Sequence, residues 1–150
     1  IYHEVPNCNS SQKVKGVLAD KSTGVFQGKV IVKKNAQKTN AQQMSKAILL
    51  SDQANSNSKP ELEIYADDVI CSHGATVGEL DENQIFYLIS RGISKQKACL
   101  ILTQAFFSEL IEESVDKLFL ETIHSKTKLE LNRMLNVNYD WGKREIIRLK

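Results

Sequence analysis

Short apolar clusters alternate with polar segments along the first 80 residues. The clusters occupy residues 30–32, 48–50, 62–65 and 69–71. They are too short for helices and are typical of β-strands of three to five residues. They recur about every 15 to 18 residues, and polar links at 33–42 and 52–60 separate them. The pattern predicts stacked short strands, and it leaves a β-solenoid and a β-sandwich or barrel both open.

After residue 80 the apolar positions take helical spacing. Asp81 can cap a first helix, with Gln84 three residues later in a capping-box arrangement, and Gly92 can end it. Ser94 can cap a second helix. The predicted apolar face of that helix consists of Ala98, Ile101, Leu102, Ala105, Phe106, Leu110 and Ile111. A further helical stretch follows. We therefore predict a strand-rich core over 1–80, a helical domain over 81–136, and a tail at 137–150 that Trp141 could dock.

Cys71 and His73 are the first candidates for chemistry. In an extended strand, residues two apart leave the same face, so thiolate and imidazole would point the same way. Such a pair can bind zinc, copper or an iron–sulfur cluster. A complete site needs more ligands, and no CxxC or HxxxH set accompanies the pair. On the pattern alone, a small buried cysteine and a satisfied polar histidine are the favoured interpretation.

Composition narrows the class of protein. Hydrophobic residues make up 41%, charged residues 25%, and the net charge is +2, which is ordinary for a globular domain and indicates neither a nucleic-acid nor a membrane binder. No apolar run approaches the ~20 residues of a membrane span. Three widely spaced cysteines indicate a reducing compartment. The acidic pair Asp67 and Asp68 suits a solvated turn. The sequence has no nucleophile elbow and no phosphate loop, which favours a scaffold or interaction protein over an enzyme.

Two long segments carry a family resemblance. They are KGVLADKSTGVFQGKVIVKKNAQKTNAQQMSKAILLSD (15–52) and KPELEIYADDVICSHGATVGELDENQIFYLISRGIS (59–94). Both resemble the C-terminal part of the SufB/SufD family of the Suf iron–sulfur cluster assembly machinery. The run Ser72-His73-Gly74-Ala75 is similar to the SufD branch, because SufB typically carries Glu-His-Glu-Ala there. The likeness fades after about Glu113, and family members are much longer, so we expect the chain to correspond to the C-terminal portion.

The resemblance implies a fold and a function. The fold would be the last coils of a right-handed parallel β-helix followed by a C-terminal helical domain. The function would be that of a scaffold subunit without enzymatic activity, which pairs with SufB through the β-helix and with the SufC ATPase through the helices. His73, with Cys71, would lie at the SufB interface and bind a transient iron–sulfur cluster shared with the partner chain. No cofactor would be tightly bound by this chain alone.

The resemblance also implies contact residues and a location. The candidate SufC contacts are Asp81, Gln84, Phe86, Tyr87 and Arg91. The location would be the bacterial cytoplasm or a plastid stroma, and the chain on its own could form a homodimer. Two alternatives stay open: a SufB-like homodimeric scaffold, and a β-solenoid binding module unrelated to cluster assembly. The second predicts an exposed aromatic row, yet only Tyr2, Phe26 and Tyr65 are aromatic before residue 80.

Overall fold

A computed structural model describes residues 1–112 and 117–135 of the chain. The chain divides into two compact units, one spanning Ile1–Asp81 and the other beginning at Glu82. Each unit has its own packing. The predicted tail at 137–150, with Trp141, lies outside the described residues.

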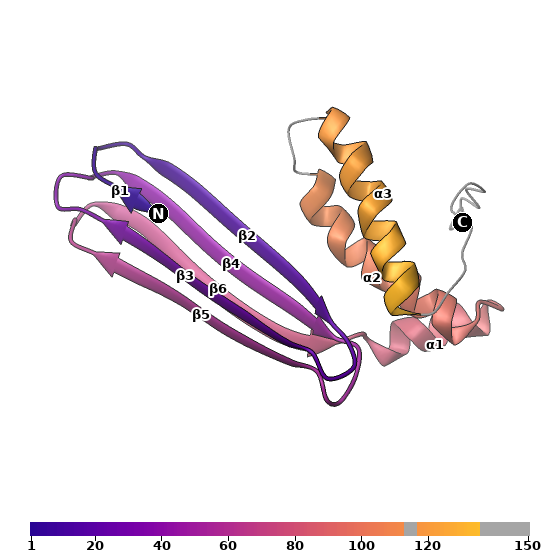
Figure 1. Cartoon of the computed structure of the whole chain (residues 1–150). Helices are drawn as coiled ribbons and strands as arrows, with labels where there is room; N and C mark the ends of the chain where they lie inside the picture. The colour runs from indigo at the N-terminus through magenta and orange to yellow at the C-terminus, as the bar shows by residue number, and fades with distance from the viewer. Residues whose placement is uncertain (113–116, 136–150) are drawn as a thin grey trace. The chain divides into compact units, whose positions relative to one another are not determined.

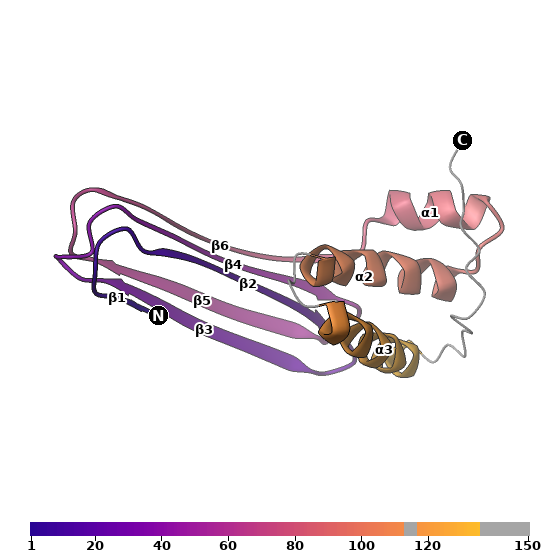
Figure 2. The same cartoon turned by 90° about the horizontal axis from the view of Figure 1, so that it is seen from above.

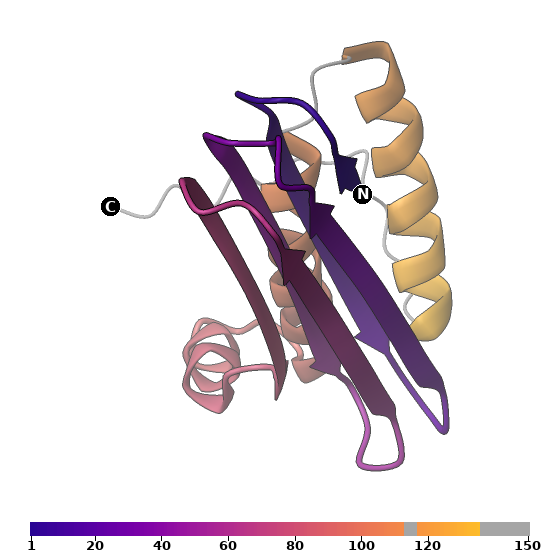
Figure 3. The ribbon, with the colours of Figure 1, turned by 90° about the vertical axis from the view of Figure 1, so that its left-hand side faces the viewer.

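The first unit consists of parallel strands in two layers (Figures 1 and 2). The strands are β1 (Tyr2–His3), β2 (Asn9–Leu18), β3 (Thr23–Val32), β4 (Thr39–Leu49), β5 (Asn55–Ile64) and β6 (Val69–Glu79). One sheet has the order β1-β3-β5 and the other β2-β4-β6. Consecutive strands therefore alternate between the sheets, and each of β1 to β4 pairs with the strand two places later. Figure 3 shows the two layers from the side of the strand ends.

The prediction of parallel strands followed by helices is confirmed, but the predicted strand lengths are wrong. β2 to β6 contain 10 or 11 residues each. The segment 52–60, predicted as a link, supplies the first half of β5. Main-chain hydrogen bonds hold a parallel ladder together whatever the side chains are, so Asn and Ser can continue a strand whose neighbour is already in place. The strands form two separate sheets, and the right-handed β-helix stays a prediction.

The apolar core of this unit lies where β3 ends and β4 begins. Val30, Val32, Ala36, Ala41 and Ala66 form it, and the partly buried Leu62, Val69 and Cys71 pack against it. Complete burial of a valine side chain contributes roughly 1.5–3 kcal/mol. The core therefore fixes the start of β6, because Val69 and Cys71 belong to that strand.

The second unit contains three helices: α1 (Glu82–Ser90), α2 (Lys95–Glu112) and α3 (Lys117–Met134). Gly92 has a φ of 82°, the left-handed conformation that glycine adopts most easily, and its N–H donates to the Ile89 carbonyl. The Ser94 hydroxyl accepts the Lys97 N–H at 3.4 Å. The predicted end of the first helix at Gly92 and the predicted cap at Ser94 are both confirmed.

The predicted apolar face of the second helix is partly wrong. Leu100 and Thr103 are fully buried there, whereas Ala105 is exposed. α2 packs against both α1 and α3, so its buried positions spread beyond a single stripe. No helix in the described part of the chain is long and apolar enough to cross a membrane.

Candidate functional site

The strand β6 holds Cys71 and His73 on the inner side of its sheet. Cys71 lies in register with Ala41 and His73 with Gln43, two β4 residues that are buried between the sheets. Cys71 packs against the apolar core. The His73 ring reaches toward the other sheet, where its Nδ1 lies 3.0 Å from the main-chain oxygen of Pro60 on β5. The prediction that the Cys71 and His73 side chains leave the same face of a strand is therefore confirmed.

His73 is exposed although it occupies an inner position. Its counterpart Gln43 is only 1% exposed, because β4 has a paired strand on either side. β6 is the last strand of its sheet, and no strand of the described residues covers its second edge. The end of the stack thus presents an imidazole to solvent, next to a thiol that is half-buried in the core.

A buried polar pair lies below His73 in the same register. Gln43 Nε2 donates to Gln12 Oε1 at 2.6 Å, and these residues and His73 occupy matching positions on β4, β2 and β6. The pair depends on Gly28 of β3, because a Cβ at Gly28 would lie 2.2 Å from Gln43 Nε2. Sequence analysis did not identify this pair. The two glutamines are 31 residues apart, so no local pattern links them. The only signal in the sequence is that Gln43 falls at an alternating position of a strand.

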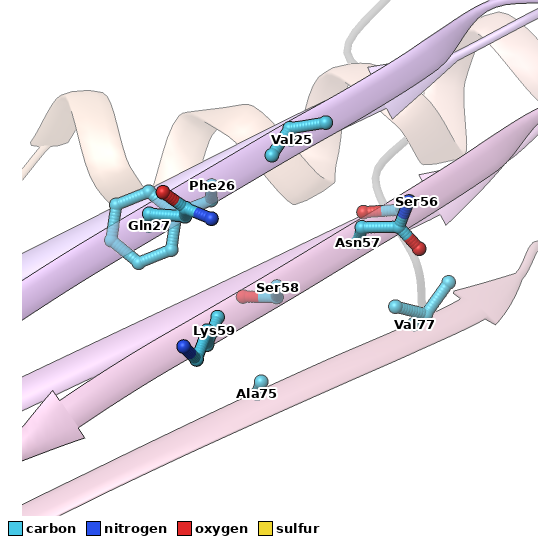
Figure 4. Close-up of a pocket in the computed structure, with 9 residues that line it drawn as sticks. All are labelled: Val25, Phe26, Gln27, Ser56, Asn57, Ser58, Lys59, Ala75 and Val77. Atoms are coloured by element: carbon cyan, nitrogen blue, oxygen red, sulfur yellow. The ribbon is translucent and has the colours of Figure 1, made fainter.

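The strands β5 and β6 lie side by side at the end of both sheets. A cleft of about 460 Å³ opens there, and Figure 4 shows its lining residues on β3, β5 and β6. Ala75 and Val77 of β6 face it, with Phe26 and Ser58 on the other side. The Ser58 hydroxyl is buried and has no hydrogen-bond partner among the described residues. The end of the stack therefore combines unpaired strand edges, apolar surface and an unsatisfied hydroxyl.

Charged side chains form a ladder on β3 and β5. Lys29 Nζ lies 2.6 Å from Glu63 and 3.5 Å from Glu61, and Lys59 Nζ lies 2.7 Å from Glu61. Hydrogen bonding and attraction from Glu63 raise the pKa of Lys29, while Lys59 lowers the pKa of the Glu61 carboxyl in the same way. These groups pair with one another in solvent, which suits a surface that aligns two strands.

The acidic pair and the cysteines complete no metal site. Asp67 and Asp68 are exposed in the turn between β5 and β6, and the Asp68 N–H donates to the Gln37 side chain at 2.9 Å. Within residues 1–112 and 117–135, no three His, Cys, Asp or Glu side chains lie close enough to hold a metal ion. The described residues of this chain therefore offer one or two ligands at most, around His73.

The candidate ATPase contacts lie at and beyond the start of α1. Asp81, Gln84, Phe86, Tyr87 and Arg91 are all exposed. Phe86 is 73% exposed, and the Arg91 guanidinium lies 5.2 Å from the centre of the Tyr87 ring. Ile85 and Leu88 are partly buried, whereas Phe86, Tyr87 and Ile89 leave large apolar side chains exposed on α1. Aromatic side chains such as Phe86 and Tyr87 are enriched at protein–protein contacts.

Comparison with known proteins identifies the family. A family model described as "SUF system FeS cluster assembly, SufBD core domain" matches residues 1–106. SufD of Escherichia coli is 47% identical over 115 residues, which cover 77% of this chain and 27% of that protein. SufD of Bacillus subtilis is 35% identical over 75% of this chain and 27% of its own length.

A plastid protein matches as well. The chloroplastic protein ABCI7 of Arabidopsis thaliana is 45% identical over 72% of this chain and 23% of its own length. The chain thus spans about a quarter of the length of the curated relatives it matches. The described strands and α1 lie within the segment that the family model covers. The chain therefore belongs to the SufB/SufD family of iron–sulfur cluster assembly proteins, and within it to the SufD branch.

Proposed function

We propose that the chain is part of a scaffold subunit, without enzymatic activity of its own, on which an iron–sulfur cluster is assembled together with a SufB-like partner. One observation carries the proposal: His73 is exposed at an inner position of the last strand of its sheet. Any subunit that adds to this edge brings its own side chains next to the imidazole. Histidine ligation of iron–sulfur clusters has chemical precedent.

A shared site explains why this chain holds so few ligands. A cluster bound by four thiolates of one chain is a permanent cofactor, whereas a cluster bound partly by an imidazole and partly by a second subunit can be released. The cluster is therefore the cargo of the scaffold, and His73 is its proposed ligand. Cys71, half-buried against the core, lines the same interface and is the weaker candidate.

The strand edges supply the binding surface for the SufB-like subunit. β5 and β6 end their sheets, and added strands satisfy the N–H and C=O groups of such edges. The same edges would let the isolated chain form homodimers. In the whole protein, we propose that the alternation of strands between two parallel sheets continues as a right-handed parallel β-helix, of which these are the last coils.

The helical unit is the proposed contact for a SufC-like ATPase. Phe86 and Tyr87 offer exposed aromatic anchors on α1, and the other candidate contacts, Asp81, Gln84 and Arg91, are exposed polar residues close to them in sequence. Aromatic residues and arginine dominate binding energy at protein interfaces. ATP-driven movement of this partner would then act on the interface with the SufB-like subunit. The chain's bacterial and chloroplastic relatives agree with a proposed location in cytoplasm or plastid stroma.

The test of the cluster role is His73→Ala in the complete complex. We expect the variant to fold and to bind the SufB-like partner as the wild type does, because the side chain is exposed, while cluster formation under anaerobic conditions falls to background. Ser72→Ala is the matched control, since Ser72 is the exposed neighbour on the opposite face of β6. Wild-type cluster yield from His73→Ala would overturn the proposal.

The test of the ATPase contact is Phe86→Ala. Truncation of an exposed aromatic anchor costs roughly 2 kcal/mol of binding energy, so affinity for the SufC-like ATPase should fall about 30-fold. Leu129→Ala on α3 is the control, because Leu129 is similarly exposed at 68% but lies on another helix. Equal affinities for the two variants would contradict the assignment of α1.

A further inference from the structure

The His73 ring is held by a main-chain group of the other sheet. Its Nδ1 lies 3.0 Å from the Pro60 carbonyl oxygen, which is 13 residues earlier in the chain. A carbonyl oxygen only accepts hydrogen bonds, so Nδ1 must be the donor and must carry the proton. In the neutral ring the other nitrogen, Nε2, then holds the lone pair.

The Pro60 carbonyl is available because of its place in β5. The N–H groups of Asn55 and Tyr65 donate to Ser22 and Val32, so the odd-numbered residues of β5 turn their main-chain groups toward β3. In a parallel strand alternate residues point to opposite sides. Pro60 belongs to the other set, so its carbonyl faces the edge of β5 that no strand pairs with, and there the His73 ring of β6 reaches it. The missing N–H of proline removes no ladder bond at that edge.

The position of this carbonyl is fixed by backbone packing. Proline locks φ near −65°, which limits rotation of the strand at this residue. Pro60 is in register with Gly28, where β3 and Gln43 of the other sheet approach so closely that no Cβ fits between them. A main-chain acceptor in a paired strand also has no rotamers, unlike a carboxylate. The hydrogen bond therefore fixes both the tautomer and the direction of the His73 ring.

We propose that the Pro60 carbonyl is the positioning group of His73: it selects the Nδ1–H tautomer and leaves Nε2 as the nitrogen that binds iron. This inference rests on the proposed role of His73 in cluster assembly. An unconstrained neutral histidine in water prefers the Nε2–H tautomer, in which Nε2 has no lone pair to donate. The carbonyl reverses that preference before the cluster arrives. Such a hydrogen bond also raises the basicity of the ligating nitrogen.

The first test is the tautomer itself, measured without any cluster. The 150-residue chain is labelled with ¹⁵N-histidine and ¹³C, and spectra are recorded at about pH 8.5, where histidine side chains are neutral. We expect His73 to show a protonated Nδ1 and an unprotonated Nε2, with scalar coupling from Nδ1 to the Pro60 carbonyl carbon. His124 on α3 provides the comparison within the same sample. A predominant Nε2–H tautomer at His73 would overturn the inference.

The second test separates positioning from ligation. His73→Nδ1-methylhistidine keeps the Nε2 lone pair but cannot donate to Pro60, whereas His73→Nε2-methylhistidine blocks the nitrogen proposed to bind iron. With the SufB-like partner, iron and sulfide, we expect the first variant to lower cluster occupancy about tenfold or more and the second to abolish it. Unchanged occupancy in the Nδ1-methyl variant would refute the positioning role.

The two hypotheses fail in different ways. If His73→Ala assembles clusters normally, the proposed function is wrong whatever the tautomer is. If His73→Ala abolishes assembly but the Nδ1-methyl variant is normal, the proposed function stands and the role of Pro60 is wrong. Only a fixed Nδ1–H tautomer together with impaired assembly by the Nδ1-methyl variant supports both.

Discussion

Gly28→Ala tests how closely the two sheets pack where Gly28 of β3 faces Gln43 of β4. A Cβ at residue 28 would lie 2.2 Å from Gln43 Nε2 and 2.7 Å from Phe26 Cζ. Gln43 is 1% exposed, so its side chain has to rearrange inside the packed interior to admit the methyl, at about 1–3 kcal/mol. Displacement of Gln43 also breaks its hydrogen bond to Gln12, at about 0.5–1.5 kcal/mol. Together these two effects destabilise the first unit by about 1.5–4.5 kcal/mol.

Amide hydrogen exchange is the assay, because it reports on the strands separately from the helices. A loss of about 1.5–4.5 kcal/mol accelerates exchange through global opening roughly 10-fold to 2000-fold in the protected amides of β3 and β4. Gly16→Ala is the matched control: a Cβ there meets nothing within 4 Å, so its exchange should stay near wild type. Equal exchange rates in the two variants would refute the packing argument at Gly28.

Three further predictions concern the edge, the charges and the helices. Pro60→Ala adds an N–H to the outer edge of β5 and should increase self-association, measured by sedimentation; an unchanged apparent mass would contradict this. Lys59→Met should raise the pKa of Glu61 toward 4.5 in an NMR titration. Because the pKa of Glu61 is lowered in the folded chain, its carboxylate stabilises the fold above about pH 4.5, and this contribution is lost as the pH falls. Ser94→Ala removes the cap of α2 and should lower the free energy of unfolding of the helical unit by about 1 kcal/mol in thermal unfolding. An unchanged stability would show that the 3.4 Å contact between the Ser94 hydroxyl and the Lys97 N–H contributes nothing.

Local signals in the sequence were sufficient to predict where α1 ends and α2 begins. Gly92 and Ser94 act on the residues beside them, so their roles follow from their type and position alone. The buried face of α2 could not be read in the same way. Thr103 is buried because α2 has neighbours on two sides, and its hydroxyl is satisfied within the helix by donating to the Cys99 carbonyl.

The features that the sequence could not predict depend on pairing between residues far apart in the chain. The polar half of β5 becomes a strand because β3 is already present beside it, in a register that joins residues 32 positions apart, such as Gly28 and Pro60. The common face of Cys71 and His73 was predictable from their spacing on a strand. The carbonyl that holds the His73 ring was not, because its position depends on how β5 and β6 meet.

The proposed role of His73 is to bind the nascent cluster through Nε2 at an interface with a second subunit. The most direct measurement is pulsed electron paramagnetic resonance of the reduced cluster in the complex, with ¹⁵N-histidine incorporated only into the chain that carries His73. We expect a ¹⁵N hyperfine coupling typical of a directly bound imidazole. A cluster that forms in full yield without any such coupling would show that His73 is not its ligand.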